Sequence, residues 1–365
     1  MTRVRISDVA AAAGVSVTTV SLVLNDVESR ISTETRERVR AAATAVGYAP
    51  SSLARGLRQQ RTHTVGLISD QIATTPFAGR MLAGAQDVAR AQGELVFLVD
   101  TGGDATVEQN AIRALAGQQV DATIYAAMWH QVVAVPAGLP KDTVFLDCRP
   151  ESGGFRSVVP DDRSGGAAAT RELVAAGHRR IAFVDTDETD DRPIAADLRL
   201  AGYRAVLAEA GIPIDPALHV HGETSVRGGR EAAGRLLDLP PAQRPTALFC
   251  FNDRMAVGAY AAVHARGLRI PHDISIIGYD DQQFLAAEQD PPLTTIALPH
   301  YDMGRWAMEV ALGIRATENK DATHQMECPV IRRDSVGPPP ALVAKPNRRR
   351  TSHNTERSPE AIPDR

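Results

Sequence analysis

The chain of 365 residues is long enough for two or three domains, and its 44% hydrophobic content can fill their cores. The three cysteines show no paired spacing, and neither a signal peptide nor a membrane-spanning apolar run is recognised, which excludes disulfide-rich, secreted and membrane-spanning classes and predicts a cytoplasmic protein. The formal net charge is −4, yet residues 1–61 hold nine arginines against five acids, so a basic head precedes an acidic body. This asymmetry would direct nucleic acid toward the head.

The first predicted elements are two short helices between Val4 and Asn25, joined by a turn at Gly14. Ser7 is the expected cap of the first helix, and Ser16 is the expected cap of the second. In a helix-turn-helix unit, the second helix presents its N-terminal residues to base edges in the major groove. The spacing therefore predicts a DNA-binding unit, with an alanine-rich helical hairpin packed on a larger core as the alternative.

A third helix and a short basic segment follow. Thr33 is expected to cap a helix that ends near Gly47. The segment 50–58 begins with proline and is too short to be stable as an isolated helix, so we expect a hinge that orders on DNA and inserts a leucine into the minor groove. The alternative is a linker helix that packs on the next domain. The residues expected in the hinge contact are Leu53, Ala54, Arg55, Leu57 and Arg58.

Residues 1 to about 66 resemble the DNA-binding headpiece and hinge of the LacI family of repressors. The resemblance is carried by ISDVAAAAGVSVTTVSLVLN, STETRERV, GYAPSSLARGL and TVGLI in succession. It implies insertion of Leu57 at the operator centre and phosphate contacts by four polar residues, namely Ser16, Thr19, Ser21 and Asn25. Base reading is implied for Val17, Thr18 and Leu22. Two of these three are apolar where many members carry polar or basic side chains, so the operator sequence stays open.

Apolar strand-like runs alternate with helical stretches from Thr64 onward, which is the rhythm of parallel sheets. The helical candidates end at or near glycine. We therefore expect an α/β core of two doubly wound parallel-sheet subdomains behind an all-α helix-turn-helix headpiece. The expected strands are residues 64–69, 95–100, 122–127, 143–148, 180–185, 247–252 and 274–280.

The resemblance to the LacI family continues to about residue 336 through AGHRRIAF, RLAGYRAVL, FCFNDRMAVGAY, ISIIGYDD and LTTIALPHYDMG. It implies a periplasmic-binding-protein-like core in which the chain crosses between subdomains within several residues of Asp161, Pro292 and His324. The expected division is headpiece 1–49, hinge and linker 50–61, first subdomain 62–161 with 293–323, second subdomain 162–292 with 324–337, and a disordered tail 338–365.

Polar residues at the carboxyl ends of the expected strands predict a ligand site, because open parallel sheets bind ligands there. They are Asp70, Asp100, Asp147, Asn252 and Asp280. Carboxylates and amides suit a neutral, hydroxyl-rich ligand such as a sugar or polyol better than a phosphate, which would want more cations. For Asp70, Asp100 and Asp147 the alternative is loop capping.

The resemblance implies that Arg199 clasps the effector and that Asp280 accepts hydroxyl groups, with Asp147 and Asn252 as further contacts. Thr224 falls where several relatives place a stacking aromatic residue, so Phe77 or Trp129 is expected to supply the apolar face. The alternative for Arg199 and Asp280 is a structural ion pair across the cleft. His130 is expected to face solvent or to be hydrogen-bonded rather than to act in catalysis.

Other function classes find little support in the motifs. The chain has no GxxxxGK[ST], GxSxG, HExxH or CxxC pattern, so we expect no catalytic residues, no cofactor and no metal site. A regulator with a nucleobase effector and, less favoured, an enzyme on a doubly wound fold are the alternatives. Induction and co-repression both remain open.

The expected assembly is a homodimer on a pseudo-palindromic operator, with paired hinges at its centre. The tail is rich in proline and charge and lacks the leucine heptads that make some relatives tetramers. A coupling of about 1–3 kcal/mol between effector and operator sites is typical of such regulators.

Overall fold

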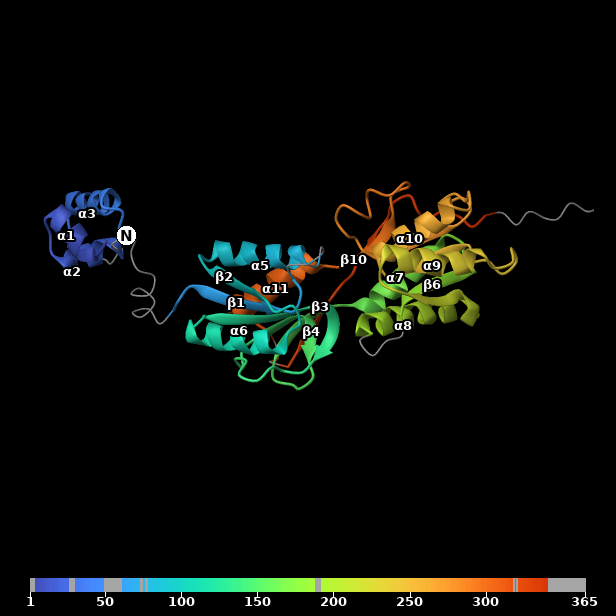
Figure 1. Ribbon diagram of the computed structural model, residues 1–365, viewed down its shortest axis with the longest axis horizontal. Helices are drawn as coiled ribbons and strands as arrows, with labels where there is room; N and C mark the ends of the chain where they lie inside the picture. The colour runs from blue at the N-terminus through green and yellow to red at the C-terminus, as the bar shows by residue number, and fades with distance from the viewer. Residues whose placement is uncertain are drawn as a thin grey trace, which may run out of the picture.

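The computed structural model describes residues 4–25, 30–48, 61–72, 75, 78–187, 192–317, 319 and 321–340. These residues form a small helical headpiece and two α/β subdomains (Figure 1). The predicted hinge contact from Leu53 to Arg58, the predicted aromatic contact Phe77 and the tail beyond residue 340 lie outside the described residues.

The headpiece is built from α1 (Ile6–Ala13), α2 (Val17–Leu24) and α3 (Thr33–Ala45). Gly14 adopts the left-handed conformation (φ 64°), which glycine tolerates because it has no Cβ. This turn lets α1 and α2 meet at 102°, within the range of about 90–120° typical of a helix-turn-helix. The three helices bury a shared core of valines and alanines, namely Val9, Ala10, Ala13, Val20, Val23, Val39 and Ala43.

Two of the expected caps are wrong by one or two residues. Helix α1 begins at Ile6, so Ser7 lies inside it, and Asp8 caps it instead by accepting the backbone N–H of Arg5 at 2.8 Å. Helix α3 is capped by Ser32, whose Oγ accepts the backbone N–H of Thr35 at 3.3 Å, rather than by Thr33. In both cases the side-chain oxygen of a neighbouring residue accepts a backbone N–H at the start of the helix, as the expected cap would have done.

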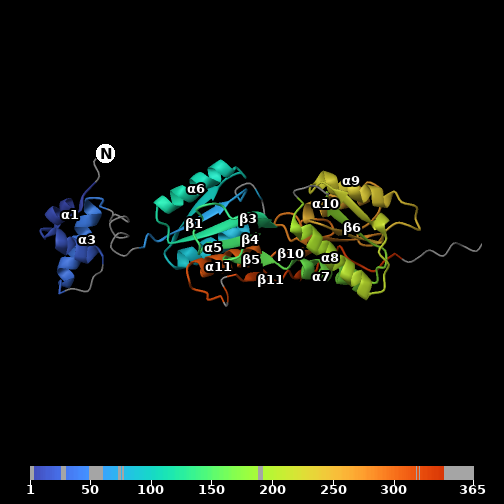
Figure 2. The same ribbon diagram turned by 90° about the horizontal axis from the view of Figure 1, so that it is seen from below.

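The first subdomain contains a six-stranded parallel sheet in the order β11-β5-β4-β3-β1-β2. Its strands are β1 (Thr64–Ser69), β2 (Leu95–Asp100), β3 (Ala122–Val133), β4 (Val144–Pro150), β5 (Arg156–Pro160) and β11 (Thr323–Met326). Helix α6 (Ala105–Gly117) covers one face, and α5 (Gly79–Ala91) with α11 (His300–Ala311) covers the other (Figures 1 and 2).

The second subdomain repeats this design with the sheet order β12-β10-β9-β8-β6-β7, in which only β12 runs antiparallel to its neighbour. Its strands are β6 (Ile181–Thr186), β7 (His219–Gly222), β8 (Ala247–Cys250), β9 (Ser275–Asp280), β10 (Thr294–Ala297) and β12 (Val330–Ile331). Helices α9 (Val226–Leu237) and α10 (Asp253–His264) cover one face, and α7 (Asp162–Ala175) and α8 (Ile194–Glu209) the other (Figure 2). A short 3-10 helix, η1 (Pro216–Leu218), precedes β7.

Two crossing points lie a few residues after the expected positions. Strand β10 pairs with β9 in the second sheet, so the start of segment 293–323 belongs to the second subdomain. Strand β11 pairs with β5 in the first sheet, so the crossing expected at His324 falls inside a strand and the chain leaves the first subdomain after Met326. Both strands are only four residues long. The alternation of apolar and polar residues over so few positions does not show which sheet a strand joins.

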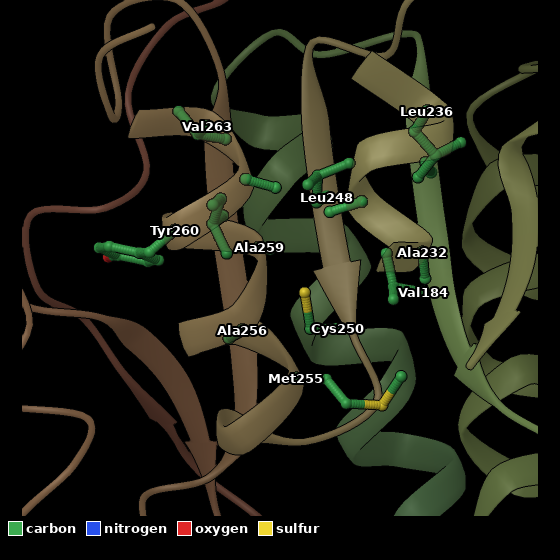
Figure 3. Packing of buried hydrophobic residues seen from close by; sticks show 14 of the residues in the cluster. Val184, Ala232, Leu236, Leu248, Cys250, Met255, Ala256, Ala259, Tyr260 and Val263 are labelled. Atoms are coloured by element: carbon green, nitrogen blue, oxygen red, sulfur yellow. The ribbon is translucent and has the colours of Figure 1, made fainter. Parts of the chain in front are cut away.

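In the second subdomain, the apolar core under α9 and α10 is larger than the one on the opposite face of the sheet, under α7 and α8. Figure 3 shows side chains of both helices, among them Leu236, Ala259 and Val263, packed against Leu248 and Cys250 of β8. The three cysteines are all buried and free: Cys148 lies in β4, Cys250 in β8, and Cys328 between β11 and β12.

Pairs of glycines let helices cross at close range on the outer faces. A Cβ at Gly202 of α8 would stand 2.2 Å from the carbonyl oxygen of Arg163 in α7, and one at Gly166 of α7 would stand 2.4 Å from that of Arg199 in α8. Gly84 and Gly304 make the equivalent reciprocal approach between α5 and α11. The close crossing of α7 and α8 brings Arg199 to the N-terminus of α7.

No single helix in the described ranges is long and apolar enough to span a membrane. Helices α1 and α2 together reach that length and apolar content, but they form a pair bent by 102°.

Candidate functional site

The N-terminal end of α2 forms the outward surface of the headpiece. Val17 is 46% exposed and Thr18 is exposed, whereas Ser21 and Leu22 one turn later are half-buried. Burial of Val20 and Val23 on the opposite side fixes this orientation of the helix. Of the residues predicted to read bases, the apolar Val17 and the hydroxyl-bearing Thr18 are therefore the most exposed.

The residues predicted to contact phosphates are held by local hydrogen bonds. Ser16 caps α2 by accepting the backbone N–H of Thr19 at 3.1 Å, and the two hydroxyl oxygens lie 2.9 Å apart. At the other end of the helix, Asn25 Nδ2 donates to the carbonyl oxygen of Ser21 at 2.5 Å. These contacts set the side-chain directions before any ligand is present.

The first residues after the linker are clamped to the first subdomain. The carboxylate of Asp121 accepts the backbone N–H groups of Thr62 and His63, each at 2.8 Å, and the hydroxyl of Thr62 at 3.2 Å. Burial opposes the charged form, yet these donors hold the pKa of Asp121 below its ordinary value. Arg61 adds an ion pair to buried Glu94 at 3.1 Å. The point where the chain enters the core is thus fixed by two acids.

A cleft between the subdomains contains an outer and an inner cavity that share Trp129, Pro193 and Phe251. The outer cavity has a volume of about 540 Å³, within the range of small-molecule sites. The inner cavity offers only about 20 Å³, which is room for about one water molecule. The inner lining combines apolar and polar side chains, and its polar members are His130, Asp147, Arg199, Asn252, Asp280 and His300. All of these except the half-buried Asp280 are buried.

Arg199 of α8 is the cation at the centre of this lining. Its Nε donates to Asp162 Oδ1 at 2.8 Å and its Nη1 to the carbonyl oxygen of Phe251 at 2.7 Å. The guanidinium also lies over the ring of Tyr279, 3.6 Å from the ring centroid, which is close cation–π contact. Burial disfavours its charge, but Asp162 more than compensates and raises the pKa of Arg199 above its ordinary value.

An ion pair between Arg199 and Asp280 exists only at long range, with Nη1 and Oδ1 3.9 Å apart. Both residues belong to the second subdomain, so the expected pair across the cleft is wrong. Asp162 is the true partner. Its place at the start of α7 adds the favourable field of the helix N-terminus, and its pKa lies below the ordinary value although burial acts against it.

An irregularity in β3 turns consecutive side chains toward the cleft. The pairing of β3 with β4 shifts register between Ala126 and Gln131, which frees Met128, Trp129 and His130 from strict alternation. All three line the inner cavity. His130 is buried rather than solvent-facing, and its Nδ1 lies 2.8 Å from Asp162 Oδ2. Its Nε2 has no hydrogen-bond partner among the described residues.

Asp147 lies within β4, at the register shift with β3, and Asp280 ends β9; they come from opposite subdomains and have positive φ values of 57° and 116°. Such backbone conformations are rare outside glycine and concentrate at functional sites. Burial raises the pKa of Asp147 well above its ordinary value, and its Oδ1 lacks a hydrogen-bond partner in the part of the chain that the structure describes. Burial likewise raises the pKa of Asp280 to about 7, while Arg199 and Arg254 act in the opposite sense.

The structure brings together five of the eight residues considered for the effector site: Trp129, Asp147, Arg199, Asn252 and Asp280. Asn252 also caps α10, its Oδ1 accepting the backbone N–H of Met255 at 2.9 Å. Asp70 follows β1 but is absent from both cavity linings, and it accepts the backbone N–H of Gln71 at 2.8 Å as a loop cap would. Asp100 likewise accepts the N–H of Gly102 at 3.0 Å.

Sequence reasoning missed Asp162, Phe251 and His300, and it undervalued His130. Asp161 and Asp162 follow the apolar run VVP, so the strand-end rule that selected the other acids would have pointed to this pair. His300 begins α11 and carries no such signal. Burial lowers its pKa to about 3, so it lines the cavity as a neutral ring.

Comparisons with known proteins agree with this architecture. Residues 5–51 match the model of the lacI family of bacterial regulatory proteins, and residues 170–336 match a periplasmic binding protein-like domain. The HTH-type transcriptional repressor PurR of Aliivibrio fischeri (strain MJ11) is 33% identical over 338 residues, which cover 91% of this chain and 98% of the relative. The chain belongs to the LacI family.

Two further relatives of this LacI-family chain extend the comparison. The ribose operon repressor of Escherichia coli K12 is 36% identical over 310 residues, covering 84% of the chain and 91% of the relative. The crystal structure of the lac repressor dimer bound to operator and the anti-inducer ONPF matches with a TM-score of 0.76 and 27% identity, covering 92% of this chain and all of the other. The chain is a DNA-binding transcription regulator of the repressor type, not an enzyme.

Proposed function

We propose that this regulator is a homodimeric repressor whose affinity for a pseudo-palindromic operator changes when a sugar or polyol binds in the cleft. The observation that carries the effector class is the buried cluster of acceptors around a single arginine. Asp147 Oδ1 and His130 Nε2 are buried without partners in the described residues, and Asp280 and Asn252 lie on the same cavity. Neutral hydroxyl groups can donate to such acceptors without adding negative charge.

The size of the inner cavity supports a conformational response. A sugar cannot reach Asp147 and Arg199 through a space that holds about one water, so the subdomains would have to separate or shift for it to enter. The two residues belong to different subdomains, and an effector that contacts both would therefore change their relative position. That change would be transmitted to the clamped residues 61–63 and on to the linker.

Ribose is the first effector to test. One relative is named the ribose operon repressor, and a matching structure at 25% identity is a LacI family regulator from Enterococcus faecium with bound ribose. Calorimetry with ribose, other pentoses, hexoses and polyols should show saturable binding for one of these classes of compound. Asp280→Asn should weaken that binding at least tenfold. Asp273→Asn, on the surface and paired with Arg269, is the matched control. Binding that is equal in Asp280→Asn and wild type would remove this residue from the site.

A nucleobase is the second candidate effector. Relatives are named PurR, and the flat side chains of Trp129 and Phe251 line both cavities, where a base could stack. Hypoxanthine and guanine belong in the same calorimetric panel. Saturable binding of a nucleobase with no response to any sugar would replace the sugar proposal.

The dimer proposal rests on an apolar edge strand. Strand β2 ends the first sheet, and its Leu95, Phe97 and Leu98 are 65%, 41% and 38% exposed. An uncovered apolar edge of this kind invites pairing with another copy. Sedimentation of Phe97→Arg should show monomers, while Ile214→Arg, which is exposed elsewhere, should stay dimeric. Tetramers in the wild-type chain would overturn the proposed assembly.

Base reading by the headpiece can be separated from phosphate binding. The DNA for this test is an operator fragment selected from random DNA by the full chain. Thr18→Ala should reduce discrimination at one base pair by about 1–3 kcal/mol. The dependence of the binding constant on salt concentration should stay unchanged. Ser21→Ala should weaken binding evenly across sequences. An unchanged base preference in Thr18→Ala would show that Thr18 reads no base.

A further inference from the structure

Three potential metal ligands gather on one face of the second sheet, at the edge away from β12. Asp185 lies on β6, and His219 and His221 lie on the edge strand β7. Asp185 is the register partner of His221, and His219 is two residues earlier on the same strand, so all three side chains project from the same face. A His-x-His pair on a strand beside a carboxylate is a chelating arrangement.

The distances bring these groups within reach of one ion. One ligand atom from each residue lies within 4.8 Å of those of the other two. His219 Nε2 is 2.9 Å from Asp185 Oδ2, and the two imidazole rings have centroids 4.5 Å apart. Tetrahedral zinc with bonds of about 2.0–2.1 Å separates its ligand atoms by roughly 3.4 Å, so rotamer adjustment of the half-buried rings would close the site.

The orientation of His221 also fits metal binding. Its Nδ1 lies 2.9 Å from the carbonyl oxygen of Thr186, which stabilises the tautomer that carries its proton on Nδ1. Metal-ligating histidines characteristically donate their second ring nitrogen to a backbone carbonyl or carboxylate in this way, and the ring lone pair is then on Nε2.

Arg192 is the group that competes for this site. Its Nη2 donates to Asp185 Oδ2 at 2.8 Å, its Nε to Asp197 at 3.0 Å, and its Nη1 to the carbonyl oxygen of Thr186 at 3.0 Å. A carboxylate offers about four lone-pair positions, and the Oδ1 of Asp185 takes one N–H, from Thr186. The ion and Arg192 can therefore share Asp185, but the positive charge of the guanidinium lowers the affinity of the ion.

We propose that Asp185, His219 and His221 bind a divalent transition-metal ion of the zinc type, with water completing the coordination. Two imidazoles and one carboxylate suit zinc, nickel or copper rather than calcium or magnesium. Thr186 and Arg192 line the outer cavity of the cleft, so the ion would add positive charge beside the effector entrance. This site stands apart from the proposed effector contacts and does not depend on them.

The test is a zinc titration of the tag-free full chain by calorimetry, followed by Co²⁺ substitution read by visible absorption. We expect one ion per chain in a four-coordinate site, and His219→Gln and His221→Gln should each weaken zinc at least about tenfold. His272→Gln, an exposed histidine outside the cluster, is the matched control and should leave the affinity unchanged. Circular dichroism of the metal-free variants checks that the fold is retained.

Arg192→Gln provides the sharper result. Removing the competing charge should tighten zinc several-fold while leaving all three ligands in place. The proposal is overturned by a wild-type chain without saturable one-to-one binding, by histidine variants that bind like wild type, or by an Arg192→Gln affinity no higher than that of wild type.

Discussion

Arg199 Nε lies 2.8 Å from Asp162 Oδ1, and both side chains are buried where α8 crosses α7. This pair gives the cleft its one fully buried arginine among the described residues and orients His130 through the second oxygen of Asp162. A buried ion pair is costly to break from one side, because the remaining charge is left without compensation. The effector site and the stability of the second subdomain therefore depend on the same contact.

Arg199→Leu should lower the free energy of unfolding of the core by about 3–5 kcal/mol, because it leaves the carboxylate of Asp162 buried with only its contact to His130. Urea denaturation of the full chain measures the change. Arg171→Leu is the matched control, since its pair with Glu209 joins the same two helices at 3.4 Å but is exposed, and it should cost less than about 1 kcal/mol. Adding Asp162→Leu to Arg199→Leu should restore part of the loss; further destabilisation would contradict this account.

Gly202→Ala should force α7 and α8 apart, because the new Cβ would stand 2.2 Å from the carbonyl oxygen of Arg163 and 2.5 Å from the backbone nitrogen of Ala167. We expect a loss of stability of about 1–3 kcal/mol and impaired effector binding, since Arg199 moves with α8. Gly117→Ala in α6 meets nothing within 4 Å and serves as the control. Thermal melting and effector calorimetry compare the two variants. Equal melting temperatures and equal effector affinities in Gly202→Ala and Gly117→Ala would show that the helix crossing tolerates a methyl group.

Asp280→Asn should change how stability depends on pH. Burial raises the pKa of Asp280 to about 7 from 3.8, so between these values the folded chain holds a proton that the unfolded chain has released. The contribution to stability is complete below about pH 4 and is lost as the pH rises through about 7. Relative to wild type, the variant should therefore gain stability as the pH rises from about 4 to about 7, and the difference should level off above about pH 7 in urea denaturation.

The control for this titration is Asp273→Asn. Arg269 holds the pKa of Asp273 below its ordinary value, so this group does not titrate in that window. A stability difference between Asp280→Asn and wild type that stays constant with pH, or that moves in favour of wild type as the pH rises, would contradict the prediction.

Asp121→Ala should release the entry of the chain into the core. It removes the acceptor of two backbone N–H groups, and hydrogen bonds to a charged group contribute about 1.5–3 kcal/mol each. We expect faster amide exchange at Thr62 and His63, together with weaker binding to the selected operator fragment in fluorescence anisotropy. Asp142→Ala, an exposed acid on the same subdomain, should change neither. Retained exchange protection would mean that other contacts hold this segment.

The effector response should weaken in Asp121→Ala as well. Asp121 immediately precedes β3, and the far part of the same strand carries Trp129 and His130 into the cleft. A strand is a rigid connection between these two ends, so loosening its start would uncouple the cleft from the linker. Operator release by effector that is unchanged in the variant would exclude this route.

Local sequence signals determined the headpiece helices and seven of the strands among the described residues. Gly14 and Ser16 mark the turn and cap of the helix-turn-helix because only backbone conformation and one hydroxyl are needed there. All seven expected strands are present, because each is an apolar run that can be seen within a few residues; β5, β7, β10, β11 and β12 carry a weaker pattern and were not expected. The same rule placed Asn252 and Asp280 at the carboxyl edge of their sheet; Asp147 lies within β4, which continues to Pro150, yet it shares a cavity with the other two.

Only the tertiary structure decided which of these polar groups face each other. The four-residue strands β10 and β11 carry too little pattern to be assigned to a sheet, so the crossing points followed from pairing rather than from sequence. The partner of Arg199 is Asp162 rather than Asp280 because a glycine-mediated helix crossing, not a strand end, brings the two charges to 2.8 Å. His130 faces the cleft because a register shift in β3 overrides alternation. Such contacts join residues far apart in the chain, and their geometry depends on packing that no local pattern encodes.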